Sequence, residues 1–115
     1  TNVCSTYNAK CQVKYRRGVP SVQNDQFLTR LVEEAGLEAW GRDRVLILSE
    51  PSMGAEDFSL YLQQAPGTMF RLGVGSPHLL NPPLHHPEFL VDESAILTGV
   101  ITLAYAAYKY WQRED

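Results

Sequence analysis

The chain has 115 residues, of which 44% are hydrophobic and 20% charged, a composition typical of a single soluble globular domain. Ten basic against thirteen acidic side chains give a net charge of −3 with no block of like charge, so nucleic acid is not an expected partner. The uncharged residues 94–108 are too few for the ~20 that cross a bilayer, so no membrane partner is expected either. The first residues have neither a basic nor an apolar signal region, and we therefore expect no signal peptide and a cytoplasmic location.

The start of the chain holds two cysteines and an alternating segment. Cys4 and Cys11 have neither the spacing of a zinc-binding CxxC pair nor the density of a disulfide-rich scaffold, so we expect free, packed thiols. In residues 8–15 apolar and polar side chains alternate with the period of a half-buried strand. Gly18 and Pro20 interrupt this pattern, which predicts a linker over residues 18–23.

Three helices are predicted after the linker. Over residues 25–40 apolar side chains recur at i, i+3, i+4 and i+7, and Asn24 is placed to cap the start. A second helix, over residues 56–65, has its acidic side chains in the first turn. The third, over residues 93–112, follows Asp92 as its predicted N-cap.

Two apolar runs between these helices predict buried strands, over residues 44–49 and 68–75. Residues 76–87 hold four prolines and no period, which predicts a loop. The order of elements indicates an α/β fold with a sheet covered by helices. Two strands make only a marginal sheet, so we expect the chain to be incomplete.

The proline-rich loop carries two adjacent histidines, His85 and His86. A neutral imidazole held by a loop could bind zinc or manganese. A metal site needs three or four protein ligands, however, so from the residues alone an ordinary loop histidine is the favoured interpretation.

A second candidate site is the turn that contains Gly54, Glu56 and Asp57. Glycine there would let backbone N–H groups approach an anionic ligand, which predicts that these residues lie near a substrate. Adjacent helical residues diverge by about 100°, so both carboxylates cannot readily face one atom. The alternative is that the two acids stabilise the start of the helix through its dipole.

Four segments of the chain resemble, in order and spacing, the end of the metal-dependent amidohydrolases that include hippurate hydrolase, N-acyl-amino-acid amidohydrolase and indole-acetyl-amino-acid hydrolase. They are GVPSVQND, MGAEDFSLYLQQAPG, FRLGVG and PLHHPEFLVDESAILTG, and together they span nearly the whole chain. The resemblance implies that residues 1–17 end an α+β lid domain with its last strand, a domain often used for homodimerisation. It implies that residues 24–115 are the C-terminal part of a metallopeptidase catalytic domain.

The resemblance also implies one metal ligand, because the histidine of the family's LHxP pattern maps to His85, whereas the position of His86 varies. The family often has Asp where Leu90 follows Phe89 here. Members of that family have their other metal ligands and general base upstream of the lid, so the resemblance implies no catalytic residue in this chain. The intact enzyme would use zinc or manganese to activate a water that attacks the acyl carbonyl of a small N-acyl amino acid. We expect the chain alone to be inactive, and the alternative function is a non-catalytic interaction or dimerisation module.

Overall fold

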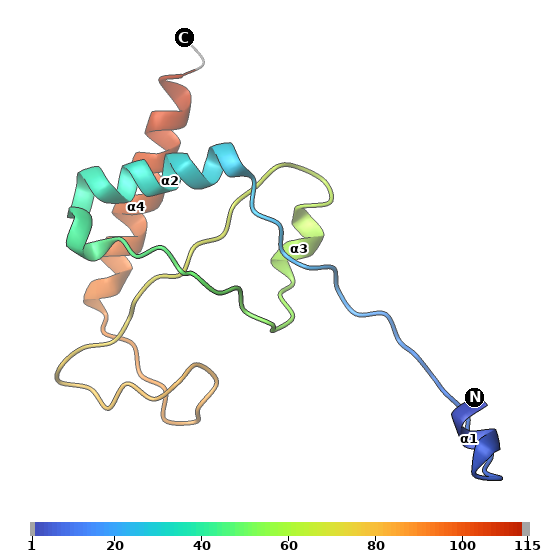
Figure 1. The fold of residues 1–115 in the computed structure, drawn as a ribbon. Helices are drawn as coiled ribbons and strands as arrows, with labels where there is room; N and C mark the ends of the chain where they lie inside the picture. The colour runs from blue at the N-terminus through green and yellow to red at the C-terminus, as the bar shows by residue number, and fades with distance from the viewer. Residues whose placement is uncertain (1, 114–115) are drawn as a thin grey trace.

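The computed structural model describes residues 2–113, in which helices are joined by long irregular connections (Figure 1). In chain order the elements are α1 (Asn2–Thr6), α2 (Gln26–Trp40), the short 3₁₀ helix η1 (Arg42–Arg44), α3 (Phe58–Tyr61) and α4 (Ser94–Trp111). The predicted helices over residues 25–40 and 93–112 are therefore confirmed to within one residue at each end. The helix predicted over residues 56–65 is shorter, because only α3 and the turns after it form.

The start of α2 is fixed by two neighbouring polar residues. Asp25 is the N-cap, and its Oδ1 accepts a hydrogen bond from the backbone N–H of Leu28 at 2.9 Å. The prediction of Asn24 as the cap is wrong by one residue. The Asn24 side chain instead donates to the carbonyl of Met69 at 2.8 Å and accepts from the N–H of Met69 at 2.9 Å. Asn24 thus joins the start of α2 to a segment 45 residues later in the chain.

The described core lies where α2 crosses α4 (Figure 1). Leu31 and Ala35 of α2 and Ala106 of α4 are buried there, with Val32 and Tyr105 packed against them. Two alanines at the contact allow the helix backbones to approach closely, so a small number of side chains excludes water.

Polar contacts border this core. The indole Nε1 of Trp40 donates to the Oγ1 of Thr102 at 2.8 Å, and Thr102 donates in turn to the carbonyl of Thr98. At the other margin Glu38 accepts from the hydroxyl of Tyr105 at 2.8 Å and forms an ion pair with Lys109. These contacts fix the register of the two helices around the apolar contact.

The predicted strands are not formed within residues 2–113. The extended segments over residues 8–15, 44–49 and 68–75 pair with no other strand there, so neither the predicted sheet nor the predicted strand over residues 8–15 is formed in this structure. The physical reason is that a strand forms only when a neighbour satisfies its backbone N–H and C=O groups. Leu46 and Ile47, predicted to be buried, are 81% and 76% exposed.

The chain is expanded rather than compact. Its radius of gyration is 20.3 Å, against about 13 Å for a compact domain of this length. Figure 1 shows the reason: α1 stands at the end of an extended segment, and the connections between α2 and α4 loop outward. Much apolar surface therefore stays in contact with water.

One face of α4 carries much of this apolar surface. Its residues share the spacing of a core-facing helix stripe but are 57% to 63% exposed: Ile96, Leu97, Val100 and Leu103. None of the helices among residues 2–113 has the length and apolarity needed to cross a membrane. The stripe therefore has the pattern of a core helix without the layer that would cover it.

Candidate functional site

The loop that carries the two histidines is closed at its base by a single side chain. Asn81 accepts a hydrogen bond from the backbone N–H of Ser76 at 2.9 Å and donates to the carbonyl of Ser76 at 2.7 Å. Its backbone has φ 47°, in the left-handed region that asparagine tolerates better than most residues. Ser76 is buried beneath this contact. The turn over residues 76–81 is thus anchored, and the next residues project from it toward solvent.

His85 lies in a tight turn in the projecting part of the loop. The N–H of His86 donates to the carbonyl of Pro83 at 3.1 Å, which places His85 at the third position of the turn. Its φ is 72°, in the left-handed region that favours glycine and that costs a residue with a Cβ about 1–2 kcal/mol. Such strain is found most often at functional positions. The His85 side chain is exposed and forms no hydrogen bond with the other described residues.

His86 differs from His85 in what its ring already binds. Its Nδ1 accepts a hydrogen bond from the backbone N–H of Glu88 at 3.1 Å. In a neutral imidazole one nitrogen accepts and the other carries the proton, so the proton of His86 lies on Nε2. That ring offers no free lone pair to a metal ion, whereas neither nitrogen of His85 is occupied.

The described residues fit a metal ion only in part. No group of three or more His, Cys, Asp or Glu side chains that could hold a metal occurs in residues 2–113. A closed zinc site requires four ligands and an open one requires three. His85 can therefore supply one ligand, and the remaining donors must come from outside this part of the chain.

The turn before α3 uses its acidic residues for local structure. The Oε1 of Glu56 accepts from the backbone N–H of Phe58 at 3.3 Å, and its carbonyl accepts from the hydroxyl of the buried Ser59 at 2.7 Å. Asp57 occupies the N-cap position without a side-chain capping bond, and Gly54 is exposed. The contact of Glu56 agrees with the alternative in which the acids stabilise the helix start.

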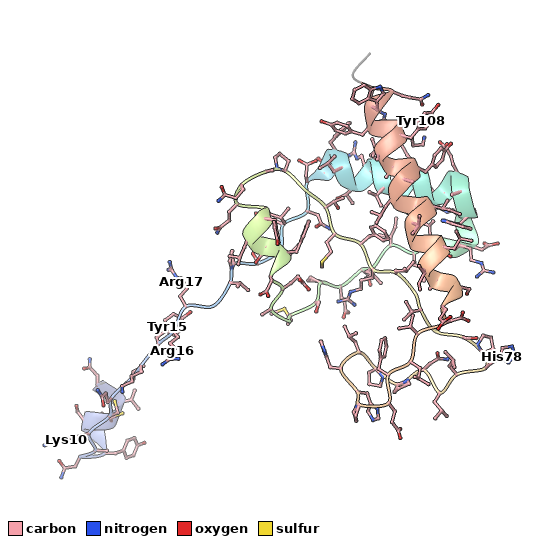
Figure 2. All side chains as sticks on the ribbon, turned by 180° about the vertical axis from the view of Figure 1, so that it is seen from behind. Lys10, Tyr15, Arg16, Arg17, His78 and Tyr108 are labelled. Carbon is pink, nitrogen blue, oxygen red and sulfur yellow. The ribbon has the colours of Figure 1, made fainter. Side chains whose placement is uncertain are left out.

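The structure does not bring the two candidate sites together. In Figures 1 and 2, the loop of residues 76–87 and α3 lie on different sides of the chain. Among residues 2–113 no hydrogen bond or ion pair links Gly54, Glu56 or Asp57 to His85. Their predicted closeness to a substrate thus remains a prediction.

The end of the histidine loop is joined to α4 by Asp92. The residue at the N-cap position is Glu93, one residue later than predicted, but the Asp92 carboxylate accepts from the N–H of Ser94 at 3.0 Å. Hydrogen bonds from Ser94 and then Ser76 hold the pKa of Asp92 below its usual value. Asp92 therefore joins both ends of the loop to the first turn of α4.

Asn81 is the residue that the sequence interpretation missed. A signal was present, because an asparagine directly before two prolines follows a segment without period, and asparagine commonly occupies turns. Its partner Ser76 could not be deduced, since the contact depends on how the whole turn closes.

Comparison with known proteins identifies the family of this chain. Residues 3–109 match peptidase family M20/M25/M40, so the chain belongs to that family. It is 63% identical over 112 residues to a Synechocystis sp. protein named "Probable hydrolase sll0100". It is 34% identical over 112 residues to thermostable carboxypeptidase 1 of Saccharolobus solfataricus, and 34% over 95 residues to the N-acetyl-L-cysteine deacetylase of Bacillus subtilis.

These matches cover most of this chain but a small part of each relative. They include 96% of the chain and 28% of the Synechocystis and Saccharolobus proteins, and 83% of the chain and 21% of the Bacillus protein. No solved structure matches the chain. The chain therefore spans about a quarter of the length of these relatives.

Proposed function

We propose that this chain is the C-terminal part of a metal-dependent hydrolase that cleaves the amide bond of N-acyl or related amino acids. The observation that carries the proposal is the state of His85, which is exposed, held in a left-handed turn and free at both ring nitrogens. An adjacent histidine with an occupied Nδ1 provides an internal contrast. Membership of a peptidase family and relatives named as a hydrolase, a carboxypeptidase and a deacetylase support the same chemistry.

The division of the chain follows from the same proposal. Residues 1–17 would end a lid domain, residues 18–23 would link it, and residues 24–115 would return to an α/β catalytic domain. The separation of α1 from the helical body supports a boundary in this region (Figure 1). The unpaired segments over residues 44–49 and 68–75 and the uncovered stripe of α4 are the surfaces on which the rest of that domain would pack. A homodimer through the lid belongs to the same proposal.

His85 would hold one zinc or manganese ion through a neutral ring nitrogen. Such an ion supplies Lewis-acid activation of the amide carbonyl and of water. The contribution of this chain is to position the imidazole: the turn from Pro83 to His86 sets its direction, and Asn81 anchors the loop behind it. No general base is assigned to this chain.

The test uses a chimera in which this chain replaces the matching part of the 63% identical Synechocystis protein. His85→Ala is compared with His86→Ala. We expect His85→Ala to lower bound metal, measured by elemental analysis, and to reduce hydrolysis of N-acetyl amino acids by more than the roughly 100-fold that loss of a residue supporting a metal ligand can cost. His86→Ala should change both much less. Small and equal effects on metal content would refute the assignment.

The exposed apolar stripe of α4 favours a second candidate, a non-catalytic module that binds another protein chain. The two functions differ in what the wild-type chimera does. Hydrolysis that depends on added zinc or manganese supports the enzyme, whereas a folded chimera without hydrolysis supports the module. The chain by itself should not hydrolyse the substrate under either function, because one ligand cannot hold a catalytic metal.

A further inference from the structure

The short stretch of chain before the histidine loop holds both ends of that loop. The N–H of Asp92 donates to the carbonyl of Val74 at 2.8 Å. A little further along the stretch, the N–H and the carbonyl of Ser76 are both bonded to the Asn81 side chain. Residues 82–91, which contain the two adjacent histidines, therefore form a loop whose two ends are fixed to the same stretch. Figure 1 shows this loop beginning and ending near the first turn of α4.

Gly75 lies directly under the Asn81 amide. A Cβ at position 75 would lie 2.8 Å from the Oδ1 and 3.2 Å from the Cγ of Asn81, inside the ~3.5–4.0 Å of an ordinary non-bonded contact. The amide can move away only by breaking its two hydrogen bonds with Ser76. At Gly73, by contrast, a Cβ would meet no described atom within 4 Å. A side chain is therefore tolerated at position 73, whereas at position 75 it would displace the amide.

The backbone of this region is held in an unfavourable conformation at two residues. Asn81 has φ 47° and His85 has φ 72°, both in the left-handed region. Such residues keep this conformation only where the surrounding structure determines it. The contacts that do so among the described residues are the amide of Asn81 and the turn from Pro83 to His86. The chain itself thus gives the loop its shape.

We propose that the Asn81 amide, held between Ser76 and the bare α-carbon of Gly75, is a clamp that gives the histidine loop its metal-binding shape before any metal binds. Asn81 and Gly75 are then positioning residues that act through His85. This inference rests on the proposed function, because it takes His85 as a metal ligand. A metal ion binds only the molecules whose loop has the required shape, so opening the clamp lowers the apparent metal affinity by the fraction of such molecules that is lost.

The first test follows the clamp without a metal, through hydrogen exchange of the Ser76 amide measured by NMR on the whole chain. In the wild type this N–H is bonded to Asn81 and should be protected. Asn81→Ala and Gly75→Ala should each accelerate its exchange about tenfold, the effect of losing about one hydrogen bond. Gly73→Ala should leave the rate unchanged. Rapid exchange of Ser76 in the wild type, or equal rates in the two glycine variants, would overturn the clamp.

The second test measures zinc affinity, by competition with a chelator, in the chimera with the Synechocystis protein. Asn81→Ala and Gly75→Ala should each lower the affinity about tenfold, at the lower end of the 10–100-fold that residues supporting a metal ligand contribute. Asn81→Gly keeps the left-handed backbone without the amide and should lose as much. The control is Asn8→Ala, because Asn8 has φ 52° but lies at the far end of the chain (Figure 1). Full affinity in Asn81→Gly would show that the backbone conformation, and not the amide, positions the loop.

Double variants separate positioning from a general loss of folding. Gly75→Ala should add no further loss to Asn81→Ala, because the atoms that it displaces are already absent. Asn81→Ala should likewise add none to His85→Ala, whereas misfolding would lower zinc affinity in both backgrounds. If His85→Ala lowers the affinity but Asn81→Ala and Gly75→Ala do not, the clamp is refuted and the proposed function stands. If His85→Ala itself has no effect, the proposed ligand is refuted, and with it the role of the clamp in metal binding.

Discussion

The contact between α2 and α4 can be tested by removing its largest buried aliphatic side chain with Leu31→Ala. Leu31 is 3% exposed and packs with Ala35 and Ala106. Leu-to-Ala changes in cores cost about 2–5 kcal/mol, and the larger losses occur where the surroundings cannot collapse. Val32 and Tyr105 border this site and are only partly buried, so they can move into the space. We therefore expect a loss of about 2–3 kcal/mol in the free energy of unfolding.

The assay is urea unfolding of the chain followed by the fluorescence of Trp40, whose indole is hydrogen-bonded to Thr102 across the helix contact. The matched control is Leu103→Ala, which makes the same deletion on α4 at a side chain that is 58% exposed. Its effect should stay within about 0.5 kcal/mol. Since a chain of this size has little stability to lose, Leu31→Ala should move the unfolding transition to a markedly lower urea concentration. Equal shifts for the two variants would refute the assignment of the core.

Two other contacts give separate expectations. Asp25→Ala should destabilise the chain by about 1 kcal/mol, because Leu28 loses its capping acceptor, and Asp25→Asn should recover most of this loss in the same urea titration. Hydrogen bonds from Lys109 and then Tyr105 lower the pKa of Glu38 from 4.5. The ionised Glu38 carboxylate therefore stabilises the fold fully above pH 4.5, and this stabilisation disappears as the pH falls through the lowered pKa. The difference in unfolding free energy between wild type and Glu38→Gln should therefore shrink between about pH 7 and about pH 3, and a constant difference would contradict this coupling.

The helices were predictable because the information that specifies them is local. Residues 25–40 show the full apolar period in one window, and Gly41, with φ 81°, ends the helix where expected. The choice between Asn24 and Asp25 as the cap was not predictable. Both side chains can accept the capping bond, and the distant contact of Asn24 with Met69 leaves Asp25 to cap the helix.

The strands could not be predicted in the same way, because a strand depends on a partner that its own sequence does not contain. Residues 44–49 have the composition of a buried strand, yet their apolar side chains face water, and no neighbouring strand within residues 2–113 accepts their backbone hydrogen bonds. The pattern therefore identifies a segment suited to a sheet, while the formation of a sheet depends on a partner strand.

The candidate site shows the same division between local and distant information. The position of His85 in a proline-rich loop was evident from the sequence, but its left-handed backbone and the occupied Nδ1 of His86 became evident only from the structure. Those two features distinguish the two histidines in their ability to bind a metal ion, and they do so without reference to relatives. A metal ion requires further donors, just as the stripe of α4 requires a covering layer. Both needs would be met by the same event, the packing of the remaining catalytic domain against this chain, so metal binding and completion of the core should be coupled.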